Sequence, residues 1–216
     1  LRFRAGISAN NISVSANDTD MLITLSDGQV ITIANWNSVN TSRIEQFEFA
    51  DGTVWASADI LANMVIVGSD GDGNVNNKYL TSGTTYDMGL GDDTVYGGKG
   101  DDAYLYNLGD GNDHISDYSG SDTLRFGAGI TADNISVIAN DTDMLITLSD
   151  GQVITIANWN SANTSRIEQF EFADGTVWAS DDIISQMVIT GTEGDGNINN
   201  KYLTSGTTYD MGLGDD

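Results

Sequence analysis

Four turns that end in aspartate recur at short, regular intervals in the middle of this chain. Asp93, Asp102, Asp113 and Asp122 are spaced 9, 11 and 9 residues apart, and each ends a glycine-containing turn. An apolar or aromatic residue follows each aspartate by two positions. Turns this frequent leave room only for very short strands, each with one side chain in a core. A single Asp-Gly turn is common in hairpins, but four in register predict a coil of short strands.

The composition of these turns also suits a hard cation. Calcium binds about six to eight oxygen atoms in proteins. Glycine allows backbone conformations that direct carbonyl oxygens inward, and each aspartate adds an anionic oxygen. We therefore expect Ca²⁺ to be the cofactor of these turns.

The units resemble the RTX nonapeptide, Gly-Gly-x-Gly-x-Asp-x-U-x, in which U is apolar. Residues 97–105 fit it closely, with Tyr104 at the apolar position, and the units that begin at Met88 and Leu108 lack only the first glycine. The unit that begins at Asp117 lacks both leading glycines. The resemblance implies a right-handed parallel β-roll with calcium between turns on the same side. The residues that it assigns to the metal are Asp93, Asp102, Asp113, Asp122, Gly89, Gly91, Gly97, Gly98, Lys99, Gly100, Gly109, Gly111, Gly120 and Asp216.

Turns on the same side of such a roll are two units apart. Asp93 would then pair with Asp113 along one edge, and Asp102 with Asp122 along the other. Two extra residues near 106–107 keep this alternation if they bulge in the loop. Upstream, Gly73 and Thr84 stand where aspartate is expected, so we expect weak or metal-free turns there, with Asp72 as a residue that could contribute.

The chain also repeats itself with a period of 123 residues. Residues 1–93 align with 124–216 with 13 differences. Hairpins are expected over 21–33, where a Ser-Asp-Gly-Gln turn joins two apolar runs, and over 44–55. Ser57 is expected to cap a short helix to about residue 64, with Asp59 in its first turn. Such similarity between copies suggests a tandem array that extends beyond both ends.

This strand-rich half, over 1–64 and 124–187, is similar to the haemolysin-type calcium-binding related domain. The stretches that carry the similarity are 124–137, 145–151 and 167–178. The expected fold is all-β, a parallel β-roll that alternates with strand-rich hairpin modules. Its boundaries are a first hairpin module at 1–67, a roll at 68–123, a second hairpin module at 124–190 and the start of another roll at 191–216.

The charge balance excludes several classes of partner. The chain has 32 acidic and 8 basic residues, a net charge of −24, so it lacks the basic patches that nucleic acids and anionic membranes need. Bound cations would offset the self-repulsion of so many carboxylates. The chain contains no cysteine, which excludes disulfides and thiolate ligands.

We do not expect an enzyme. His114 is the only histidine, so neither a serine–histidine–aspartate set nor a zinc site can be assembled. Adjacent carboxylates such as Asp101 and Asp102 are explained by calcium rather than by glycosidase chemistry. The four tryptophans, at 36, 55, 159 and 178, fit the packing of a small β core better than a sugar platform.

Two classes of function remain. The favoured one is a calcium-binding structural segment of a large secreted or cell-surface bacterial protein, such as an adhesin, matrix or layer component. Its partners would be calcium and neighbouring repeats of the same protein, including self-assembly. The alternative is the calcium-dependent secretion and folding region of an exported toxin or enzyme whose catalytic domain lies outside this chain. Glycan or ice binding by a flat repeat face is a weaker third possibility.

Overall fold

The computed structural model describes residues 1–16, 20–36, 44–68, 70–76, 81–140, 142–159, 166–190 and 208–210. Strands dominate this part of the chain, which confirms the all-β prediction. No helix in the described ranges is long and apolar enough to cross a membrane. The described strands are β1 (Ile12–Ala16), β2 (Met21–Leu25), β3 (Val30–Ile33), β4 (Gln46–Glu48), β5 (Val54–Ala56), β6 (Met64–Val67), β7 (Asn74–Asn76), β8 (Thr85–Asp87), β9 (Thr94–Tyr96), β10 (Ala103–Tyr106), β11 (His114–Ser116), β12 (Thr123–Phe126), β13 (Ser136–Ala139), β14 (Met144–Thr147), β15 (Val153–Ile156), β16 (Gln169–Glu171), β17 (Val177–Ala179), β18 (Val188–Thr190) and β19 (Thr208–Asp210). The helices are α1 (Ser57–Ala62), α2 (Ser180–Gln186) and the 3-10 turn η1 (Ala9–Asn11).

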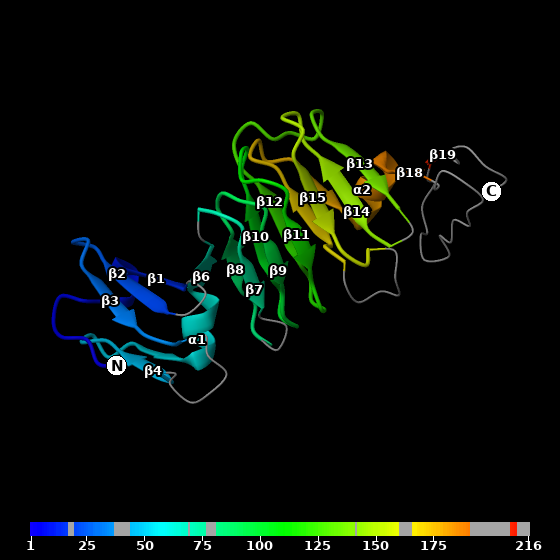
Figure 1. Cartoon of the computed structure of the whole chain (residues 1–216). Helices are drawn as coiled ribbons and strands as arrows, with labels where there is room; N and C mark the ends of the chain where they lie inside the picture. Colours follow the sequence, from blue (N-terminus) through cyan, green and yellow to red (C-terminus); the bar gives the residue numbers. More distant parts are fainter. Residues whose placement is uncertain are drawn as a thin grey trace.

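Most of these strands belong to one of two long sheets (Figure 1). One has nine strands in the order β17-β16-β12-β10-β8-β6-β1-β2-β3, and the other has eight in the order β19-β18-β13-β14-β15-β11-β9-β7. The hairpin of β4 and β5 forms a separate two-stranded sheet. Figure 1 shows the short strands β7 to β12 in the middle, with a hairpin module on either side.

The roll is built from six short strands that alternate between the two sheets. Strands β8, β10 and β12 pair in parallel in one sheet, and β7, β9 and β11 pair in parallel in the other. The resemblance to the RTX nonapeptide predicts this alternation. The extra residues before β11 lie in the loop at 107–110, where Asp110 accepts a hydrogen bond from the backbone N–H of Asn107. The loop therefore absorbs them without shifting the strand register.

Each roll strand buries the side chain at the apolar position of its unit. Rings of Tyr86 and Tyr104 stack at 5.1 Å between centroids, and both are almost fully buried. Burial of a side chain of this size contributes about 1.5–3 kcal/mol. Trp36 and Trp159 are buried as well, which favours the core interpretation of the tryptophans. The buried side chains at the apolar positions are Val75, Tyr86, Val95, Tyr104, Ile115 and Leu124.

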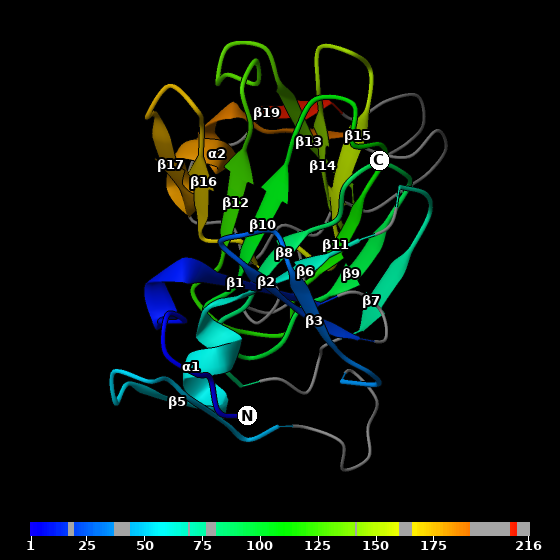
Figure 2. The same ribbon diagram turned by 90° about the vertical axis from the view of Figure 1, so that its left-hand side faces the viewer.

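The second hairpin module continues both sheets of the roll. Strand β15 pairs in parallel with β11, and β16 pairs in parallel with β12. The antiparallel pairs β13–β14, β14–β15 and β16–β17 complete the module. Figure 2 shows β16 and β17 beside β12, with α2 next to them. The roll and the module thus share backbone hydrogen bonds on both sides.

The first hairpin module repeats these elements and joins the roll through β6, which pairs in parallel with β8. Its helix corrects one expectation. Ser57 is the first helical residue of α1 and the N-cap is Ala56, whose backbone N–H donates to Asp59 at 2.9 Å. The same arrangement recurs in α2, where Ala179 donates to Asp182. Alanine has no side-chain oxygen, so the carboxylate of the first turn supplies the cap.

Two glycines of one turn provide a test of how closely the rungs of the roll approach. Gly109 and Gly111 both have positive φ, at 93° and 123°, but only at Gly111 would a Cβ overlap the carbonyl of Gly91. We expect Gly109→Ala to cost about 1–3 kcal/mol from backbone strain alone, and Gly111→Ala to cost clearly more. Urea unfolding in millimolar calcium measures both. Equal losses would mean that this close approach does not limit the roll.

Candidate metal centre

The turns of the roll line up along two edges. We call the turns that lead into β8, β10 and β12 the even edge, and those that lead into β7, β9 and β11 the odd edge. Within each sheet the strands pair in register, so turns on one edge stack directly. The predicted pairs are brought together in this way, Asp93 with Asp113 and Asp102 with Asp122.

On the even edge, each carboxylate accepts a hydrogen bond from the backbone of the preceding turn. Asp102 accepts from the N–H of Thr84 at 2.7 Å, and Asp122 accepts from the N–H of Asp102 at 2.8 Å. The second oxygen of Asp102 accepts from the N–H of Gly98 within its own turn. Each of these aspartates therefore links its own turn to the preceding turn on the same edge.

The odd edge follows the same rule. Asp93 accepts from the N–H of Gly73 at 2.7 Å, and Asp113 accepts from the N–H of Asp93 at 3.0 Å. Gly73 and Thr84, where aspartate was expected, thus act as backbone donors to the next rung. The expectation that the turns at 68–87 bind metal weakly or not at all stays a prediction.

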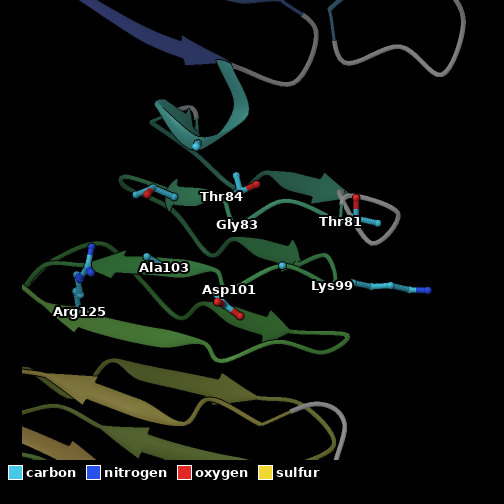
Figure 3. Close-up of a pocket in the computed structure, with 10 residues that line it drawn as sticks. Thr81, Gly83, Thr84, Lys99, Asp101, Ala103 and Arg125 are labelled. Atoms are coloured by element: carbon cyan, nitrogen blue, oxygen red, sulfur yellow. The ribbon is translucent and has the colours of Figure 1, made fainter. Parts of the chain in front are cut away.

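A second set of carboxylates, one residue before Gly73, Asp93 and Asp102, accepts hydrogen bonds from the following turn on the same edge. Asp72 accepts from the N–H of Asp92 at 3.0 Å, and Asp101 accepts from the N–H of Ser121 at 2.9 Å. Asp92 likewise accepts from Asn112. Figure 3 shows the outer side of the even edge, where Asp101 and Lys99 lie on the rung next to Gly83 and Thr84 around an open pocket. These exposed acids fasten the outside of the turns.

Three carboxylates converge on the even edge. One oxygen from each of Asp102, Asp117 and Asp122 lies within 4.8 Å of the others. Their exposed fractions are 2%, 3% and 0%. The hydroxyl of Tyr104 donates to Asp117 at 2.5 Å. This is the group among the described residues that best suits a metal ion.

Asp117 was not predicted as a ligand. It stands where the nonapeptide has its first glycine, so the pattern treats it as a lost glycine. Its side chain occupies the space above Gly97, where any Cβ would overlap the Asp117 carboxylate and the Tyr104 hydroxyl. The sequence did offer one signal for this ligand. Asp117 replaces a glycine of the pattern, whereas the preceding unit on the same edge keeps that glycine at Gly97.

Burial makes these carboxylates resist ionisation. Burial, together with the neighbouring Asp117 carboxylate, raises the pKa of Asp102 to about 7 and that of Asp122 to about 8. On the odd edge burial raises the pKa of Asp113 to about 7. The two ion pairs seen among the described residues, Arg2–Glu48 and Arg125–Glu171, lie outside the cluster. A bound cation would counter these shifts, because its positive charge favours the ionised carboxylates.

The donor set fits calcium. Asp117 Oδ1 and Asp122 Oδ2 are buried without a hydrogen-bond partner, and buried polar atoms of this kind require an explanation. Carboxylate and carbonyl oxygens are the ligands that calcium prefers. Of the other predicted residues, Gly97, Gly98, Lys99, Gly100 and Gly120 lie in the even-edge turns that hold the cluster, and Lys99 is exposed beside Tyr118. The odd-edge turns contain Gly89, Gly91, Gly109 and Gly111. Asp216 lies outside the described residues, and His114 does not join the cluster.

Comparison with known families agrees with the resemblance read from the sequence. Residues 20–59 and 143–182 match the haemolysin-type calcium binding protein related domain. These stretches run from β2 to α1 and from β14 to α2. The chain therefore contains two stretches that are similar to this domain, one on either side of the roll. A search of curated proteins found no match.

The raised pKa values predict an unusual pH dependence without metal. A carboxylate with a raised pKa stabilises the fold while it is protonated, so that contribution is lost as pH rises through about 7 to 8. In EDTA, we expect the β signal in circular dichroism to be greater at pH 5.5 than at pH 8.5. Millimolar calcium should restore the signal at pH 8.5. A signal in EDTA that is unchanged or grows toward pH 8.5 would contradict this assignment.

Proposed function

We propose that this chain is a calcium-binding structural segment of a large secreted or cell-surface bacterial protein, such as an adhesin, matrix or layer component. The observation that carries the proposal is the buried cluster of Asp102, Asp117 and Asp122, with two oxygens that lack a partner. The family match to a calcium-binding related domain supports the same metal.

Calcium would drive folding because the apo roll brings like charges together in a small core. The chain carries a net charge of −24 and 25 glycines, so both self-repulsion and chain entropy oppose folding. A site that forms only when the turns stack converts binding energy into folding energy. Calcium is plentiful outside cells, where such a segment would then become ordered.

A structural role is favoured by the way the modules join. Strands β15 and β16 continue the two sheets of the roll, and β18 leads on to β19 in the same sheet as β15. Neighbouring units therefore share sheets rather than loose linkers, which suits a stiff array whose units support one another. In the alternative, a toxin or enzyme region, the same folding would serve export of a catalytic domain elsewhere.

Calcium should switch folding of the whole 216-residue chain. At pH 7.5 in EGTA we expect weak β signal in circular dichroism, and a cooperative gain of β signal on addition of millimolar CaCl₂. Magnesium at the same concentration is the control, because it prefers octahedral sites that keep several waters. A full β spectrum in EGTA would rule out the calcium-driven fold.

The array should be rigid only when calcium is bound. We expect small-angle X-ray scattering of a chain with three 123-residue periods to give an elongated, stiff particle in calcium, and an expanded flexible chain in EGTA. The single 216-residue chain is the reference for length per period. A compact particle of the same shape in both conditions would exclude the structural role and favour the toxin or enzyme alternative.

A further inference from the structure

The even-edge ladder does not end at the last aspartate of the roll. The backbone N–H of Asp122 donates to Glu168 Oε2 at 2.8 Å. In return, the backbone N–H of Glu168 donates to the carbonyl of Asp122 at 3.0 Å. Glu168 leads into β16, which lies beside β12 as β12 lies beside β10. Glu168 thus occupies the place of the next aspartate, although it belongs to the second hairpin module.

The odd edge ends differently. There β15 lies beside β11, and the module places Gln152 against the last turn. Gln152 Oε1 accepts from the N–H of Gly109 at 3.0 Å and from the hydroxyl of Tyr106 at 3.1 Å. The side-chain oxygen of Asn112 accepts from the N–H of Val153. These groups are neutral amides, so among the described residues a carboxylate continues the ladder only on the even edge.

Glu168 lies next to the three-carboxylate cluster. Its side chain is half-buried, and its carboxylate senses both the Asp117 carboxylate and the Arg166 guanidinium. Arg166 is itself held on Trp159, with its guanidinium 5.6 Å from the ring centroid and its Nε bonded to the backbone carbonyl. A fourth acid therefore borders a site that already contains two buried oxygens without partners.

We propose that Glu168 completes, from the module side, the calcium site formed by Asp102, Asp117 and Asp122, so that one cation fastens the roll to the hairpin module that follows it. This inference rests on the proposed calcium-binding function. It assigns a role to a residue outside every nonapeptide unit. Filling of the site would then order the roll and dock the module in a single step.

The chain contains its own control for this role. Glu45 is the counterpart of Glu168 in the first copy, with the same sequence from Ile44 to Ala56 as from 167 to 179. Glu45 is exposed, and no described carboxylate cluster lies beside it. Substitution of Glu45 therefore removes the same charge from the same local structure without touching the site.

The test is calcium calorimetry on the full chain with four proteins: wild type, Glu168→Gln, Glu168→Ala and Glu45→Gln. Glutamine keeps an oxygen that can accept from the N–H of Asp122 but removes the charge. We expect Glu168→Gln to weaken the tightest calcium site about tenfold or more, and Glu45→Gln to leave it unchanged. A loss confined to Glu168→Ala would show that Glu168 is only a hydrogen-bond acceptor, and would overturn the proposal.

The same measurements distinguish failure of the Glu168 proposal from failure of the proposed calcium-binding function. Failure of the wild type to bind calcium would reject the calcium-binding function itself. Normal wild-type binding, lost in Asp102→Asn but kept in Glu168→Gln, would reject only the role of Glu168. If Glu168→Gln does not fold in saturating calcium, Glu168→Asp decides. A chain that folds and binds calcium again supports the proposal, because aspartate keeps the charge, and a chain that folds no better than Glu168→Gln opposes it, because the charge then makes no difference.

Discussion

The carboxylate that accepts a backbone N–H from the preceding turn is the interaction on which the rest of the structure depends. Strands of three or four residues offer few hydrogen bonds of their own, so the turns must hold each rung in place. Asp102 and Asp122 do so on one edge, and Asp93 and Asp113 on the other. Hydrogen bonds to charged acceptors are about twice as strong as neutral ones, which suits this role.

The same interaction creates the need for a cation. To reach the backbone of the neighbouring turn, the aspartates must lie between rungs, where water is excluded and other carboxylates are close. The pKa values of Asp102, Asp113 and Asp122 rise as a result. Structure and charge therefore conflict in the apo protein, and a dication between the turns would relieve the conflict without breaking the ladder. Under the proposed function, calcium would be part of the core rather than an addition to it.

The hairpin modules continue the sheets of the roll by backbone pairing. In the first copy, β6 joins the nine-stranded sheet that contains β10 and β12, whereas its counterpart β18 joins the eight-stranded sheet that contains β9 and β11. The second module therefore connects the odd strands of the roll to β19, which is the counterpart of β8 in the repeat. This exchange maintains backbone pairing across the junction.

Much of this architecture followed from local patterns. The resemblance to the RTX nonapeptide predicted the alternation of β7 to β12 between sheets, and the apolar position in each unit predicted the buried side chains, because both follow from a pattern that repeats at a fixed interval. The hairpins of β2–β3 and β4–β5 were equally clear from their turn residues. The capping of α1 was not, because the first-turn carboxylate replaced the expected serine.

Only the tertiary structure decided which acidic residues outside the regular aspartate positions of the repeat lie close together. Asp117 lies at a glycine position and joins Asp102 and Asp122 because two turns stack and Gly97 leaves space for it. Glu168 lies 46 residues beyond Asp122 and reaches it only because β16 pairs with β12. The sequence by itself determined the rung, its turn and the type of metal it suits, since these are encoded within about ten residues. The composition of the site where the roll meets the module depended on long-range strand pairing, which no local pattern specifies.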